Sequence, residues 1–154
     1  MESYIISLDD VFEQYIRSAV SELPTLGFGR VASVDGNLTR HQRPLFSDNA
    51  KYRTKPDLII RDKRGALAIG DVKYKMKTSE EDRYQIISHA LSHQVQKAVL
   101  VYPKPATMLQ GGLARLGAIG AVHPIEIFEY FFDLSADLDA EEVALRQAIS
   151  QFLT

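Results

Sequence analysis

The chain has 154 residues, of which 45% are hydrophobic and 25% are charged, as is ordinary for a soluble globular protein. This length favours a single domain over residues 1–154 with a core of its own. The chain has no cysteine, which excludes disulfides, a cysteine nucleophile and cysteine-ligated metal sites. Together with the lack of a leader pattern and of any apolar run near the roughly 18 residues of a membrane span, this fits a cytoplasmic protein.

The charge is unevenly distributed although the net value is only −2. Residues 51–77 hold nine Lys or Arg and three Asp, whereas residues 1–22 hold five acids and one Arg. Residues 126–142 hold seven acids and no Lys or Arg. A basic middle between acidic ends predicts a local phosphate-binding surface. The alternative is an ordinary solvated hairpin.

The first expected element is a helix from Ser7 to Leu23, in which Ser7 caps the N-terminus. Apolar residues recur along it at helical spacing and predict a core-facing stripe. The stripe consists of Leu8, Val11, Phe12, Tyr15, Ile16, Ala19 and Val20. Glu13 lies beside it and could be a solvated helix residue.

A first hairpin or irregular strand pair is expected over residues 31–45, around the turn at 35–37. Arg40, His41 and Arg43 cluster there, either as part of the basic surface or as an exposed edge. The polar stretch from Ser47 to Thr54 then leads into the next element.

A second hairpin is predicted over residues 55–75, because two short apolar runs flank a charged turn that ends in Gly65. Its register places Asp57 opposite Gly70 or Asp71. Neighbouring strands lie about 4.8 Å apart, so two carboxylates there could share one metal ion. Alternation along the strand points Asp71 and Lys73 to one side and Val72 into the core.

A helix capped by Thr78 or Ser79 is expected to run to about His93. Its predicted buried face consists of Tyr84, Ile87, Ala90 and Leu91, with Gln85, His89 and His93 on a neighbouring stripe. His89 and His93 match an H-x-x-x-H metal spacing, but the Glu of a zinc-protease helix is missing.

The apolar segment from Lys97 to Tyr102 predicts a buried strand, paired through a crossover with the strand that holds Ile69. Residues 105–120 are expected to form a loop with one helical turn, residues 124–134 a strand and residues 137–153 a final helix. This order predicts a three-layer α/β/α domain around a mixed sheet of four to six strands.

Pro56-Asp57, thirteen further residues and then Asp71-Val72-Lys73 resemble the PD-(D/E)XK nuclease motif. The following Tyr74-Lys75 and the later Asp82-Arg83-Tyr84-Gln85 resemble the nuclease domain of the McrC family, the cleavage subunits of modified-cytosine restriction systems. Phe12-Glu13 fits the same resemblance, which covers about Leu8 to Tyr102 and implies a restriction-endonuclease-like fold. In that family a tyrosine stands where this chain has His89.

The resemblance implies Mg²⁺-dependent hydrolysis of DNA, with Mn²⁺ able to substitute. Asp57, Asp71 and the Val72 carbonyl would hold the metal, and Lys73 would orient the attacking water and stabilise developing charge. The other implied roles are a metal-facing Glu13, an active-site Gln85, and DNA contacts from Arg53, Lys55, Lys75 and Arg83. A nucleotide-driven motor subunit or a larger restriction complex is the implied partner.

Two other interpretations stay open. Asp57, Asp71 and Lys73 could form an ordinary surface ion pair, which would contribute about 0–1 kcal/mol. The chain could instead be a catalytically silent nucleic-acid-binding or assembly module that kept the nuclease fold.

Overall fold

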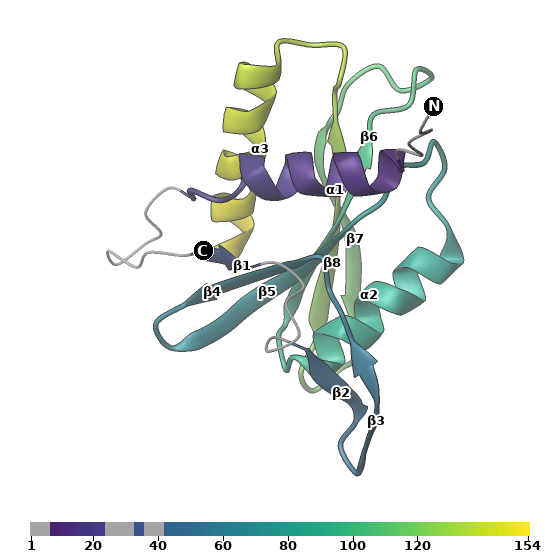
Figure 1. The fold of residues 1–154 in the computed structure, drawn as a ribbon, viewed down its shortest axis with the longest axis vertical. Coiled ribbons are helices and arrows are strands. Elements are labelled where there is room, and N and C mark those ends of the chain that lie inside the picture. The colour runs from purple at the N-terminus through teal and green to yellow at the C-terminus, as the bar shows by residue number, and fades with distance from the viewer. Residues whose placement is uncertain (1–6, 24–32, 36–41) are drawn as a thin grey trace, which may run out of the picture.

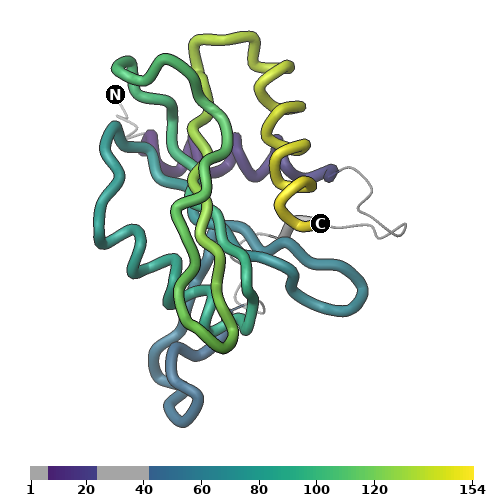
Figure 2. The backbone as a smooth tube through the Cα atoms, turned by 180° about the vertical axis from the view of Figure 1, so that it is seen from behind, coloured from purple at the N-terminus to yellow at the C-terminus, as the bar shows by residue number. Residues whose placement is uncertain are grey.

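The structure, a computed structural model, describes residues 7–23, 33–35 and 42–154. A six-stranded sheet runs through the middle, α1 and α3 cover one face and α2 covers the other (Figures 1 and 2). This confirms the predicted three-layer α/β/α architecture. The elements in chain order are α1 (Leu8–Ala19), β1 (Ser33–Asp35), β2 (Arg43–Phe46), β3 (Asn49–Thr54), β4 (Leu58–Asp62), β5 (Gly65–Val72), α2 (Glu80–Ser92), β6 (Lys97–Pro103), β7 (Gly112–Ile119), β8 (Ile125–Phe132) and α3 (Leu138–Leu153).

The strand order of the central sheet is β1-β4-β5-β6-β8-β7. β5, β6 and β8 are parallel, whereas β1, β4 and β7 pair antiparallel with their neighbours. Leu58 pairs with Gly70 across the β4–β5 hairpin, so Asp57 comes opposite Asp71, as the sequence predicts. The chain passes through α2 between β5 and β6, which are parallel neighbours, as expected.

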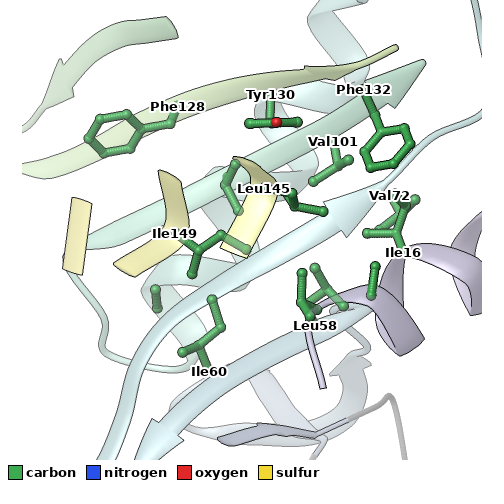
Figure 3. Close-up of a cluster of buried hydrophobic side chains, with 14 of the residues drawn as sticks. Ile16, Leu58, Ile60, Val72, Val101, Phe128, Tyr130, Phe132, Leu145 and Ile149 are labelled. Carbon is green, nitrogen blue, oxygen red and sulfur yellow. The ribbon is translucent and has the colours of Figure 1, made fainter. Parts of the chain in front are cut away.

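Alternation along the strands builds two cores, one on each face of the sheet. Leu58 and Ile60 face α1 and α3, and Figure 3 shows them with Ile16, Leu145 and Ile149. Ile59 and Ile69 face α2 on the other side. Each fully buried Ile or Leu side chain stabilises the fold by about 1.5–3 kcal/mol. The two cores fix α1 and α2 relative to the end of β5.

α1 begins as predicted, since the Ser7 Oγ accepts a hydrogen bond from the Asp10 N–H, but it ends at Ala19. Phe12, Ile16 and Ala19 are buried, whereas Leu8 and Val11 are exposed, so the predicted stripe is too long. The reason is that the first turn lies beside the chain after β5, where the Asp9 carboxylate accepts the Tyr74 N–H at 3.1 Å.

α2 is capped by Ser79 but turns a different face inward from the one predicted. Its buried residues are Asp82, Ile86, His89 and Ala90, while Tyr84 and Leu91 are 61% and 62% exposed. Asp82 and His89 lie next to polar groups beneath the helix. The buried face of α2 therefore contains two polar side chains, whereas the prediction assumed that all its members are apolar. None of the described helices is long and apolar enough to cross a membrane.

Two further strand regions differ from the sequence predictions. Residues 47–54, expected to be a polar lead-in, contain β3, which pairs with β2 in a separate two-stranded sheet. The turn expected at 35–37 lies mostly outside the described residues. Residues 112–119 form the edge strand β7 rather than a loop, with Gly111 close to β8, where a Cβ would lie 2.5 Å from the Phe131 carbonyl oxygen.

Candidate active site

A cleft of about 480 Å³ lies where the start of α1, the end of β5 and the start of α2 meet. Each element brings polar side chains to it for a local reason. The register of the β4–β5 hairpin sets the acids, α1 brings Glu13, and the Ser79 cap fixes the first turn of α2. The lining residues are Asp9, Asp10, Glu13, Asp57, Val72, Lys73, Tyr74, Lys75, Glu81, Asp82 and Gln85.

Asp57 and Asp71 are joined by reciprocal hydrogen bonds. The Asp57 N–H donates to Asp71 Oδ1 at 3.2 Å, and the Val72 N–H donates to Asp57 Oδ2 at 2.8 Å. Each carboxylate is therefore held by the backbone at or next to the other acid. The fold brings the two predicted acids together, and Val72 points into the core as expected.

Asp71 lies deeper than the sequence alone indicates, with 1% of its surface exposed. Its Oδ2 is 3.0 Å from Nδ1 of the buried His89. Neither atom makes a hydrogen bond of acceptable geometry among the described residues, so the contact is a close approach of two buried polar groups. Both side chains are buried, so the ring of His89 limits the space into which the Asp71 carboxylate can turn.

Glu13 faces Asp57 from α1, as the resemblance implies. Burial raises the pKa of Asp57, and a hydrogen bond with Glu13 and the charge of Asp71 raise it further, to about 8, against the opposing Val72 N–H. Arg17 links Glu13 to the backbone of Asp57, because its Nη2 donates to Glu13 Oε1 at 2.9 Å and to the Asp57 carbonyl at 3.3 Å. Carboxylates this close are stabilised by a shared proton or by a cation.

Lys73 and Gln85 meet in the cleft, as predicted for both. The Lys73 Nζ donates to Gln85 Oε1 at 2.8 Å, and its backbone N–H donates to the Val101 carbonyl at 2.9 Å. Gln85 of α2 thus holds the ammonium in the cleft that Asp57 and Glu13 also line.

Lys75 lines the same cleft but is engaged by the protein. Its Nζ lies 2.8 Å from Asp82 Oδ1 and 3.2 Å from Ser79 Oγ. Asp82 in turn accepts a hydrogen bond from the buried Tyr102 hydroxyl at 2.9 Å. Burial would raise the pKa of Asp82, but hydrogen bonds from Lys75, Tyr102 and Ser79 outweigh it, and the net pKa is lowered. Lys75 therefore ties the end of β5 to the start of α2.

The remaining predicted DNA contacts do not line the cleft. Arg53 lies on β3 and donates to the Gln42 carbonyl at 3.0 Å, and the exposed Lys55 follows that strand. Arg83 projects on the side of α2 that faces β7, in a shallow cavity with Ile87 and Leu116.

The sequence does not assign Arg17 or Asp9 to this site, and it does not predict the contact of His89 with Asp71. Arg17 could have been found from its i,i+4 spacing to Glu13. Asp9 reaches Tyr74 across 65 positions, and His89 meets Asp71 only when α2 packs on the sheet, so no local pattern predicts either contact.

A cation at this site would be held through oxygen ligands. Within the described ranges no cluster of three or more His, Asp or Glu side chains is arranged to hold a metal ion. The groups that fit are a carboxylate pair, Asp57 with Asp71 or with Glu13, supplemented by the Val72 carbonyl and waters. Such an oxygen-only set suits Mg²⁺, which keeps several waters when bound.

The fold and site define a class of protein, a three-layer α/β/α domain with paired acids and a lysine at one end of a β-hairpin. The chain belongs to the family of McrBC 5-methylcytosine restriction system components, whose pattern it matches over residues 1–103. It is also similar in fold to a chain in the solved half-complex of the tetradecameric assembly of Thermococcus gammatolerans McrB AAA+ hexamers with bound McrC, with a TM-score of 0.71 at 15% identity. That similarity covers 97% of this chain and 34% of the other, so this chain spans about a third of its length. No curated protein matches the sequence.

Proposed function

We propose that the chain is a metal-dependent nuclease domain that hydrolyses DNA phosphodiester bonds in a McrBC-type restriction system. The observation that carries the proposal is the reciprocal bonding of Asp57 and Asp71, with Glu13 and Lys73 in the same cleft. A surface ion pair would not bury Asp71 or raise the pKa of Asp57. Burying charged groups costs free energy, and functional sites commonly retain them despite that cost.

Asp57 and Asp71 would hold the Mg²⁺, or Mn²⁺ in its place, with the Val72 carbonyl as a further ligand. The bound ion would supply an activated water and neutralise charge on the scissile phosphate. Glu13 adds negative charge beside Asp57, and Arg17 keeps Glu13 turned toward it.

Lys73 would supply positive charge to the reacting groups, which the metal ligands cannot do. Its ammonium would donate hydrogen bonds to the attacking water and to a non-bridging phosphate oxygen, where negative charge develops. Gln85 holds that ammonium in the cleft before the substrate arrives, so little reorganisation is needed. Lys73 is the residue whose loss should affect chemistry more than binding.

A nucleotide-driven motor subunit is the proposed partner. The similar solved complex contains McrB AAA+ hexamers with bound McrC, and this chain belongs to the McrBC component family. A restriction system acts on DNA inside the cell, so the proposed site of action is the cytoplasm.

The test is cleavage of plasmid DNA by the chain with Mg²⁺, with Mn²⁺ and with chelator, comparing wild type with Asp71→Asn. Calorimetric titration of both ions accompanies it. The proposal expects ion-dependent cleavage and ion binding in the wild type and loss of both in the variant. A wild-type chain that binds neither ion, or an Asp71→Asn variant that cleaves equally, contradicts it. If the chain binds DNA but does not cleave it under any ion condition, even with a motor subunit added, the result favours the catalytically silent binding module.

A further inference from the structure

The hairpin formed by β2 and β3 projects from the body of the molecule (Figures 1 and 2). Its two strands form a sheet of their own that is not hydrogen-bonded to the six-stranded sheet, and they pack against α2. Nothing in the proposed hydrolysis uses this hairpin. Its side chains nevertheless differ from those of an ordinary exposed turn, because many of them are basic or aromatic.

The hairpin combines positive charge with exposed aromatic rings. Phe46 and Tyr52 are 49% and 51% exposed and meet edge to face, with ring centroids 6.1 Å apart. The Lys51 Nζ lies 5.4 Å from the centre of the Tyr52 ring. Its other basic side chains are Arg43 on β2 and Arg53 on β3, and Asp48 is the one acid of residues 42–55.

A cavity of about 600 Å³ lies at the base of the hairpin, between β2, the β4–β5 hairpin and the end of α2. Arg43 and Arg61 line it together with the apolar Leu45 and Phe46. No Asp or Glu is among its described lining residues. In a chain of net charge −2, this is a local concentration of positive charge.

The cleft has the opposite character. It is lined by six carboxylates and two lysines, and one of these lysines, Lys75, is ion-paired with Asp82. Such a cleft attracts a cation and repels a polyanion. A nucleic-acid substrate therefore needs an attractive surface elsewhere, near enough to deliver a phosphate to the acids.

The β2–β3 hairpin lies close enough to the acids, because β3 leads directly to Asp57 along the chain. Only Lys55 and Pro56 separate the end of β3 from Asp57. Tyr52 is five residues from Asp57, at most about 17 Å along an extended chain. At about 3.4 Å per nucleotide, a strand of some five nucleotides covers that length.

We propose that the β2–β3 hairpin and the cavity at its base bind a DNA strand with unpaired bases. Arg43, Lys51 and Arg53 contact its phosphates, and Tyr52 and Phe46 stack on its bases. Half-exposed aromatic rings stack on any base that has a free face, whereas bases inside a duplex have both faces covered by their neighbours. The choice of DNA rests on the proposed nuclease function, while the binding itself is independent of hydrolysis.

The first experiment measures binding of the whole chain to a dye-labelled single-stranded oligonucleotide, to its duplex and to the RNA of the same sequence, in chelator. We expect the single DNA strand to bind most tightly and Tyr52→Ala to weaken it by about 5- to 150-fold, since stacking contributes roughly 1–3 kcal/mol per base. Lys51→Gln with Arg53→Gln should reduce the salt slope by about 1.4. Lys63→Gln with Arg64→Gln, in the exposed β4–β5 turn, is the matched control and should change neither quantity.

The second experiment uses the absence of tryptophan from the chain. Tyr52→Trp keeps an aromatic ring and supplies the sole tryptophan, whose fluorescence should be quenched when a base stacks on it. Leu109→Trp, at a fully exposed position, should not be quenched. Equal quenching in both variants, a Tyr52→Ala affinity within twofold of wild type, or equal or tighter binding of duplex or RNA overturns the inference.

The two proposals can fail separately. A chain that never cleaves but loses strand binding in Tyr52→Ala supports the hairpin and refutes the nuclease. A chain that cleaves with Mg²⁺, and whose strand binding is unaffected by Tyr52→Ala, does the opposite.

Discussion

At the scale of single residues, the pair formed by His89 and Asp71 decides how the deeper acid is held. Both side chains are buried, and Asp71 Oδ2 lies 3.0 Å from His89 Nδ1, with no hydrogen bond of acceptable geometry to either atom among the described residues. A buried acceptor that loses its partner costs about 1–3 kcal/mol, and more when it is charged. His89 thus stabilises both the fold and the geometry of a proposed metal ligand.

We expect His89→Phe, which keeps a ring but removes the nitrogen, to lower the free energy of unfolding by about 1–3 kcal/mol. Adding Asp71→Asn should cost much less in the variant than in the wild type, because the pair is already broken. Urea unfolding of the four proteins measures the coupling. Costs that add to within about 0.5 kcal/mol would show that the two residues act independently.

A second prediction at the scale of single residues concerns Asp82 and the pH dependence of stability. Its folded pKa is lowered by Lys75, Tyr102 and Ser79 despite burial, so its contribution to stability is present above the ordinary unfolded value of about 3.9. That contribution is lost as the pH falls below about 4 and through the folded pKa. Urea unfolding between pH 2.5 and 7 should show a steeper acid loss in wild type than in Asp82→Asn. Parallel curves would contradict the lowered pKa.

At the scale of elements, the sequence predicts what local patterns control. The β4–β5 hairpin follows from two apolar runs and Gly65, and its register alone brings Asp57 opposite Asp71. The inward face of α2 does not follow from the sequence. A search for periodic apolar residues treats Asp82 and His89 as exposed, although both are buried against polar groups inside the fold. The sequence likewise does not predict the ion pair of Lys75 with Asp82, which forms only in the fold, so the predicted DNA contact of Lys75 stays a prediction.

β7 and the β2–β3 hairpin were missed for another reason. Their side chains are largely exposed, and backbone pairing holds them in place, so they lack the apolar alternation of a half-buried strand.

The observed face of α2 can be tested by substitutions along one helix. Ile86→Ala should lower the free energy of unfolding by about 2–5 kcal/mol, because it opens a cavity under a fully buried side chain. Leu91→Ala, one of the residues that the sequence predicts to be buried, should change it by no more than about 0.5 kcal/mol. Denaturant titration of the two variants measures both values, and the reverse order would restore the face that the sequence predicts.

At the scale of the whole molecule, charge is divided between two places. Carboxylates gather in the cleft, and basic and aromatic side chains gather on the projecting hairpin, with β3 leading directly from one to the other. We propose cation binding and hydrolysis for the cleft and strand binding for the hairpin. Losing a cleft residue should therefore impair the chemical step, and losing a hairpin residue should impair affinity.

The most direct test of the central claim is single-turnover cleavage of DNA at saturating protein, combined with calorimetric Mg²⁺ titration, for wild type and Lys73→Ala. A protonated lysine is not a Mg²⁺ ligand, so the variant should bind the ion as the wild type does. It should cleave at least about 100-fold more slowly, because an interaction made in the transition state is lost. A Lys73→Ala variant that cleaves at the wild-type rate would contradict the account.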